Sequence, residues 1–157
     1  MGKEIERKFL VDKQKWQPSG EKVHIRQAYL SNQPERTVRV RIAGNISFLT
    51  VKGKAEGITR AEFNYIIPVE DAEELFKLAI DTIIVKYRYK LWYRGKLWEV
   101  DEFLNENEGL LLAEVELNSA SDVVVLPEWV DTEVSYDKKY FNSYLSKFPF
   151  NTWNRIK

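Results

Sequence analysis

Charged and apolar residues alternate with a period of two along most of the chain. This alternation is typical of β-strands with one apolar and one polar face. Short connections such as Gly44-Asn45 and Arg94-Gly95 favour hairpins, so we expect a mainly antiparallel sheet. The pattern predicts eight strands, at residues 3–11, 24–31, 36–44, 46–54, 59–67, 83–93, 96–104 and 110–118.

Helical patterns are few. Residues 70–80 place apolar side chains at helical spacing, which predicts an amphipathic helix. Two further helices are predicted at about residues 119–125 and 136–148. A chain of 157 residues is large enough to bury a core of its own, so we expect a single domain over residues 1–157, of mainly β (α+β) class.

Composition narrows the chemistry. The 24 basic and 24 acidic residues cancel, so no nucleic acid partner is expected. The chain has no cysteine and one histidine, His24, which leaves carboxylate oxygens as metal ligands and favours Mg²⁺, Mn²⁺ or Ca²⁺. The charged first residues and the lack of an apolar run of about 18 residues predict no signal peptide or membrane span, so we expect a cytoplasmic protein.

The charges sort by strand. Basic residues fall on the third, fourth and sixth predicted strands, and acidic residues on the seventh and eighth. An antiparallel sheet with one face in water also alternates in this way, so a single strand has a plain structural explanation. Eight hairpin-connected strands can instead close into a barrel, and one face then becomes a lumen. Periodicity leaves open whether the charged face lies inside or outside.

Charges inside a barrel would need water, each other or a ligand. A polyanion carrying a metal ion would satisfy both signs, which points to a triphosphate. The predicted phosphate-binding residues are Lys8, Arg39, Arg41, Lys52, Lys86 and Arg88. The predicted metal ligands, for Mg²⁺ or Mn²⁺, are Glu4, Glu6, Glu114 and Glu116.

The charged residues also match a known family in order along nearly the whole chain. They are the opening Glu4-Ile5-Glu6-Arg7-Lys8, the Arg39-x-Arg41 strand, Lys52, Glu62, Lys86-x-Arg88, Asp101 and Glu114-x-Glu116. This set resembles the CYTH superfamily, the triphosphate tunnel metalloenzymes. The resemblance implies an eight-stranded antiparallel β-barrel tunnel with a few helices packed outside. Its lumen would bind a triphosphate with one or two divalent ions.

Family members include inorganic, thiamine and RNA triphosphatases and class IV adenylate cyclases, so the fold does not settle the reaction. The chain most resembles the small bacterial members that act on inorganic tripolyphosphate. The resemblance therefore implies metal-dependent hydrolysis of the terminal phosphate. Two alternatives stay open: a cyclase that converts ATP to cyclic AMP and pyrophosphate, and a polyphosphate-binding module without catalysis.

The resemblance also assigns catalytic roles. Glu62 and Asp101 are expected to prepare the attacking water or to hold cations in place. Tyr29 and Lys86, together with Lys8, are expected near the reacting phosphate. Lys138 is expected to reach the tunnel mouth as a further phosphate ligand. Because helices are few, outer apolar strand surface is expected to remain that a second copy could cover in a homodimer.

Overall fold

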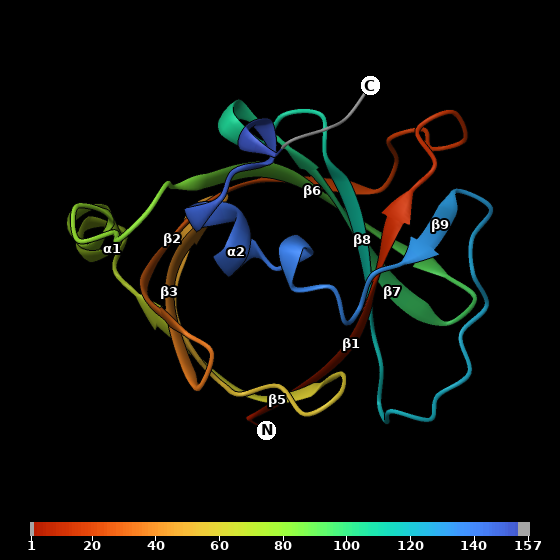
Figure 1. Cartoon of the computed structure of the whole chain (residues 1–157), viewed down its shortest axis with the longest axis horizontal. Coiled ribbons are helices and arrows are strands. Elements are labelled where there is room, and N and C mark those ends of the chain that lie inside the picture. Colours follow the sequence, from red (N-terminus) through yellow and green to blue (C-terminus); the bar gives the residue numbers. More distant parts are fainter. Residues whose placement is uncertain (1, 154–157) are drawn as a thin grey trace.

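Eight antiparallel strands form a closed barrel in the computed structural model, which describes residues 2–153 (Figure 1). Around the ring the order is β5, β4, β3, β2, β6, β7, β8 and β1, and pairing of β1 with β5 closes it. The strands are β1 (Lys3–Val11), β2 (Glu21–Gln33), β3 (Arg36–Ala43), β4 (Ile46–Gly53), β5 (Thr59–Ile67), β6 (Ile84–Tyr93), β7 (Lys96–Phe103) and β8 (Leu111–Glu116). The predicted antiparallel barrel is confirmed.

A ninth strand, β9 (Val130–Glu133), lies outside this ring and has no counterpart in the prediction. It pairs with the end of β1, at Phe9 and Val11. The same edge of β1 pairs with β5 only at residues 3–5, so its second half is free for another partner. Strand β9 has only four residues, which is too short for an alternating pattern to be recognised in the sequence.

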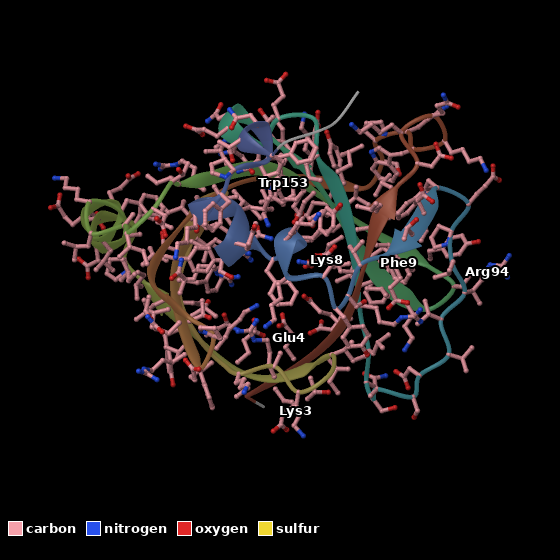
Figure 2. All side chains as sticks on the ribbon, in the orientation of Figure 1. Lys3, Glu4, Lys8, Phe9, Arg94 and Trp153 are labelled. Carbon is pink, nitrogen blue, oxygen red and sulfur yellow. The ribbon has the colours of Figure 1, made fainter. Side chains whose placement is uncertain are left out.

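The charged face of the barrel points inward. Figure 2 shows Glu4 and Lys8 directed into the ring, whereas Lys3 and Phe9 point away from it. This arrangement answers the question that periodicity left open. Apolar side chains of β1, β6, β7 and β8 form an outer core with Trp16 and the chain before β9. Much of the apolar packing of the barrel therefore lies on its outside.

Helix α1 (Val69–Phe76) packs outside the barrel, as predicted. Its Ala72 and Phe76 lie against Ala28, Val40 and Ile42 of the neighbouring strands, and all five are buried. The helix thus covers the apolar outer face of β2 and β3 and leaves the inner face to the charges.

The helix predicted at residues 119–125 is wrong, because this segment forms a turn and irregular chain. The carboxylate of Asp122 accepts hydrogen bonds from the backbone N–H groups of Asn118 and Ser119, and from the ammonium of Lys96. Such side-chain bonds compete with helical ones. Three successive valines and Pro127 follow, which also disfavour a helix.

The helix predicted at residues 136–148 is only partly present. It consists of a 3₁₀ turn, η2 (Lys138–Tyr140), and a short helix, α2 (Asn142–Lys147). Phe141 between them has an extended backbone (φ −73°, ψ 138°), which interrupts the helix. Two other 3₁₀ turns, η1 (Asn105–Asn107) and η3 (Phe150–Thr152), complete the elements.

Helix α2 does not pack outside, and the expectation of outer helices is corrected for this segment. In the view down the barrel it lies within the ring of strands (Figure 1). Its Leu145 is buried against Ile84, Phe103 and Leu112, at the barrel end formed by the start of β6, the end of β7 and the start of β8. Apolar packing thus anchors α2 across this end.

No helix within residues 2–153 has the length and apolar character needed to cross a bilayer. Strand β5 exposes Phe63, Tyr65 and Ile66. A second copy covering this surface stays a prediction.

Shortening Leu145 is expected to weaken the attachment of α2. Leu145 is 0% exposed, so Leu145→Ala should lower the free energy of unfolding by about 2–5 kcal/mol, the range for a buried leucine that leaves a cavity. Urea unfolding followed by tryptophan fluorescence measures this change. Leu78→Ala is the matched control, because Leu78 is 64% exposed, and its effect should stay below about 0.5 kcal/mol. Equal effects would contradict the packing described for α2.

Candidate active site in the barrel lumen

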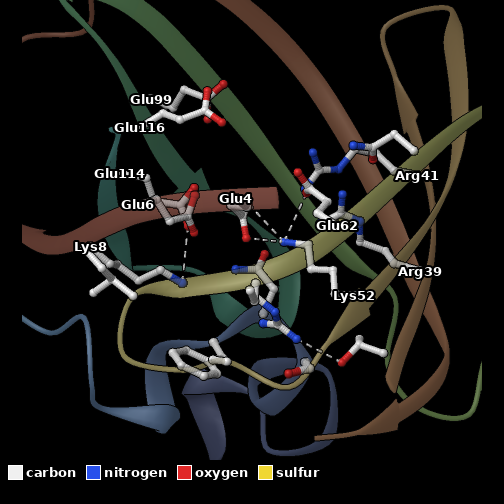
Figure 3. Close-up of a pocket in the computed structure, with 18 of the residues that line it drawn as sticks. Glu4, Glu6, Lys8, Arg39, Arg41, Lys52, Glu62, Glu99, Glu114 and Glu116 are labelled. Carbon is white, nitrogen blue, oxygen red and sulfur yellow. Dashed lines mark hydrogen bonds and ion pairs between the residues drawn. The ribbon is translucent and has the colours of Figure 1, made fainter. Parts of the chain in front are cut away.

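The lumen contains a cavity of about 400 Å³ whose walls are densely charged (Figure 3). Its cationic lining residues are Lys8, Arg39, Arg41, Lys52, Arg60, Lys86 and Arg88. Its acidic lining residues are Glu4, Glu6, Glu62, Glu99, Glu114 and Glu116. They share this space because alternate residues of each strand point to the same face, and closure brings the faces of all eight strands together.

Carboxylates crowd one part of the wall. Glu6 on β1 is the direct cross-strand partner of Glu116 on β8, and Glu99 on β7 is that of Glu114. Like charges placed opposite one another are destabilising unless a cation lies between them. Burial, together with the charges of Glu114 and Glu4, raises the pKa of Glu6 well above its ordinary value. Burial and Glu99 raise that of Glu116 in the same way.

Guanidinium groups on β3 form a second part of the wall. Arg39 donates to the hydroxyl of Thr50 at 3.3 Å, and its Nε has no partner among residues 2–153. Arg41 donates to the side-chain oxygen of Gln27 at 2.7 Å. In the described part of the chain, no carboxylate lies within 4.0 Å of either guanidinium. Burial and the charges of Arg39 and Arg88 lower the pKa of Arg41 to about 9.

Two lysines lie where the charges of opposite sign meet. Lys52 Nζ is 3.2 Å from Glu4 and 3.5 Å from Glu62, as the dashed lines in Figure 3 show. Lys8 Nζ is 3.3 Å from Glu114 and also donates to the backbone oxygen of Tyr140 at 2.9 Å. These pairs partly neutralise the carboxylates Glu4, Glu62 and Glu114.

A fully compensated cluster lies between β6 and β7. Arg88 donates through Nε and Nη2 to the two oxygens of Asp101, at 2.8 and 2.9 Å, and Lys86 Nζ is 2.8 Å from the same carboxylate. Burial opposes ionisation of Asp101, but the cations hold its pKa far below the ordinary range. Burial lowers the pKa of Lys86 to about 7, with Arg88 and Arg41 adding to the effect and Asp101 opposing it.

The structure brings most of the predicted site residues to one cavity. The lining includes Glu4, Glu6, Lys8, Tyr29, Arg39, Arg41, Lys52, Glu62, Lys86, Arg88, Glu114 and Glu116. Asp101 is 2% exposed and is not part of the lining, but it contacts two lining cations, Lys86 and Arg88. Lys138 is exposed on η2 and is absent from the lining.

Several lining residues were missing from the predicted site. Arg60 and Glu99 follow the charged phase of their strands, so the same alternation could have identified them. Phe141, Asn142 and Ser143 carry no such signal, because they enter the lumen through the position of α2.

The profile of the CYTH domain matches residues 2–148 of this chain. The chain belongs to the CYTH domain family. Over 154 residues it is 44% identical to a protein of Acetivibrio thermocellus named inorganic triphosphatase, and the match covers 98% of this chain and 99% of the relative. A protein of the same name from Nitrosomonas europaea is 37% identical over 150 residues, with 91% and 96% covered.

Solved structures of similar proteins support the same fold. The crystal structure of an inorganic triphosphatase superposes with a TM-score of 0.66 at 34% identity, covering 91% of this chain and 97% of that one. A conserved protein from Pyrococcus furiosus superposes with a TM-score of 0.57 at 24% identity, over 75% of this chain and 80% of that one. The latter likeness concerns the fold alone.

Removing the charge of Asp101 is expected to destabilise the protein strongly at neutral pH. Asp101→Asn leaves Lys86 buried without a carboxylate partner and leaves Arg88 only Glu99 at 3.2 Å and Glu114 at 3.4 Å, which should cost about 3–5 kcal/mol of unfolding free energy. The folded pKa of Asp101 is lowered, so its contribution is present above the unfolded value, near 3.8, and is lost as pH falls. The difference from wild type should therefore stay constant from pH 7 to about pH 4 and shrink from about pH 4 to pH 2.

Urea unfolding across this pH range tests the expectation, with Asp131→Asn as the control because Asp131 is exposed. A wild-type advantage that stays constant down to pH 2 would argue against a buried, ionised Asp101.

Proposed function

We propose that this protein is a metal-dependent inorganic triphosphatase, which removes the terminal phosphate of tripolyphosphate or a similar small triphosphate. The observation that carries the proposal is the division of the lumen. The guanidiniums of the buried Arg39 and the half-buried Arg41 have no carboxylate partner, and they lie in the same cavity as crowded carboxylates. A polyanion carrying a divalent cation complements both. The names of the Acetivibrio and Nitrosomonas relatives point to the same substrate class.

The cations divide the work of binding phosphate. Arg39 and Arg41 offer planar groups of donors suited to bidentate contact with phosphate oxygens. Arg60 lines the same cavity, and its Nε donates to the backbone oxygen of Gly53 at 3.1 Å. Lys8 and Lys52 are salt-bridged, so substrate would share them with carboxylates. We propose that these residues bind the phosphate chain.

The carboxylates fit a divalent metal. Glu4, Glu6, Glu114 and Glu116 would hold Mg²⁺ or Mn²⁺, as one or two ions, since these ions prefer oxygen ligands. The mutual repulsion that raises the pKa of Glu6 and Glu116 is what such an ion would relieve. In residues 2–153 no three acidic or imidazole groups are already gathered as a complete metal site. When bound, the metal would withdraw charge from the phosphate oxygens and orient the triphosphate.

The reaction transfers a phosphoryl group to water. The water oxygen bonds to the terminal phosphorus, the bond from that phosphorus to the bridging oxygen breaks, and orthophosphate and pyrophosphate leave. The arginines and lysines of the wall neutralise the non-bridging oxygens throughout. Lys86, with a pKa of about 7, is suited to hold or release a proton at Nζ, and Tyr29 lines the same cavity. We assign both to the reacting phosphate.

The remaining two carboxylates of the predicted site, Glu62 and Asp101, serve as positioning groups in this proposal. Both oxygens of Asp101 accept from Arg88 and Lys86, and Glu62 pairs with Lys52. A carboxylate held by two cations is a poor proton acceptor, because its pKa is lowered. Glu62 has one cation partner at 3.5 Å, so it is the better candidate to orient water.

Incubation with tripolyphosphate, ATP and thiamine triphosphate under Mg²⁺ or Mn²⁺ tests the reaction. Tripolyphosphate is expected to give equimolar orthophosphate and pyrophosphate at the highest rate. Cyclic AMP formed from ATP, with no tripolyphosphate turnover, would replace the proposal with a cyclase. Binding of tripolyphosphate without turnover would replace it with a binding module.

Glu6→Gln is expected to lower metal-dependent turnover by about 100-fold or more, because a catalytic metal contributes several kcal/mol to the transition state. The thermal midpoint of the free protein should stay the same or rise, since the variant removes a buried repulsion. Stabilisation by Mn²⁺ should be lost. Glu35→Gln, at an exposed position, is the matched control. Full turnover in Glu6→Gln would refute the metal assignment.

A further inference from the structure

Asn142, the first residue of α2, contacts a buried cation of the lumen, Lys86. Its Oδ1 accepts from Lys86 Nζ at 2.8 Å and from Gln27 Nε2 at 2.9 Å. Gln27 in turn accepts from Arg41 Nε through Oε1, at 2.7 Å. One chain of hydrogen bonds therefore connects α2 to Lys86 on β6 and to Arg41 on β3.

The chemistry of the donors determines how both amides are oriented. Lysine and arginine side chains can only donate, so each must face an amide oxygen. The oxygen of Gln27 faces Arg41, which turns its amino group toward Asn142, and the oxygen of Asn142 faces Lys86. Gln27 is 0% exposed and Lys86 1% exposed, so water does not substitute for these partners. The arrangement has one consistent set of donors and acceptors.

These bonds exceed what anchoring of α2 requires. Leu145 already packs the helix into an apolar cluster at the barrel end. The polar contacts instead aim at two residues that line the charged cavity. A neutral amide satisfies Lys86 without adding a second carboxylate beside Asp101, whereas an apolar residue would leave buried donors unpaired.

We propose that Asn142 is a positioning residue of the triphosphate site: its side-chain oxygen holds the ammonium of Lys86 and, through Gln27, the guanidinium of Arg41. The proposal rests on the proposed function for the identity of the substrate. Asn142 acts through these cations, so its removal should impair the reacting arrangement more than the capture of substrate. The segment from η2 to α2 then helps to position the cations of the site. The hydrogen bond from Lys8 Nζ to the backbone oxygen of Tyr140 agrees with this role.

A double-mutant cycle on the full chain tests the proposal. With tripolyphosphate and Mg²⁺, Asn142→Leu is expected to lower kcat by about 10- to 100-fold, the range for loss of a hydrogen bond to a charged group, with KM changed less than about threefold. In a Lys86→Met background the same substitution should lower kcat clearly less than it does in wild type, because only the contact through Gln27 to Arg41 is left to lose. Lys147→Ala, on the exposed far end of α2, is the control.

The double-mutant cycle either supports or overturns the positioning role of Asn142. Non-additivity supports the proposal, whereas additive losses, or an unchanged kcat in Asn142→Leu, would overturn it. If wild type does not turn over tripolyphosphate, the proposed function fails by itself. The same cycle is then read from the free energy of unfolding, where additive losses overturn the contact by which Asn142 holds Lys86 and coupled losses support it.

Asn142→Asp keeps the acceptor oxygen and serves if Asn142→Leu does not fold. A carboxylate there should raise the pKa of Lys86, which Asp101 on β7, Arg88 on β6, Arg41 on β3 and Glu114 on β8 also influence. The limb of the kcat profile that reports Lys86 is expected to move to higher pH by about one unit or more. An unmoved profile would contradict contact between the two side chains.

Discussion

Enclosure of many charges in a closed barrel is the constraint on which this structure depends. A buried charge costs several kcal/mol unless it is paired, so each charged side chain of the lumen needs a partner from another strand or from a ligand. The Arg88 and Asp101 pair, joined by Lys86, meets this need within the protein. Arg39 and Glu6 do not, and this incomplete pairing is what the proposed ligand, a phosphate chain with a metal ion, would complete.

Placing charges inside changes where the stabilising packing lies. The apolar faces of the strands point outward and are covered by different parts of the chain. Helix α1 covers β2 and β3, while Trp16 and Trp129 cover the side formed by β1, β7 and β8. Because the hydrophobic contribution comes from these outer layers, the lumen does not have to be filled by side chains and keeps a cavity of about 400 Å³. Stability and binding are thereby assigned to opposite faces of the same strands.

The C-terminal segment joins the two faces. Leu145 binds it to the barrel end by apolar packing, and Asn142 on the same short helix reaches the cations of the lumen. The extended residue Phe141 makes this possible, because it breaks the helix where the chain turns inward. If α2 were placed differently on the same barrel, Lys86 and Arg41 would lose these contacts and would be held in place less firmly.

The sequence by itself determined the strands, their antiparallel pairing and most of the charged residues that line the cavity, because period-two alternation survives in each strand separately. The order of Glu4, Glu6, Arg39, Arg41 and Lys86 along the chain also pointed to the family. Tertiary structure decided what no local pattern contains. Closure of β1 onto β5 set the charged face inside, and pairing across strands decided that Asp101 is compensated while Arg39 is not. The contacts of Asn142 arise only from the place of α2 within the ring, since an amide in a short polar segment has no periodic signal and takes its partners from residues more than 50 positions away.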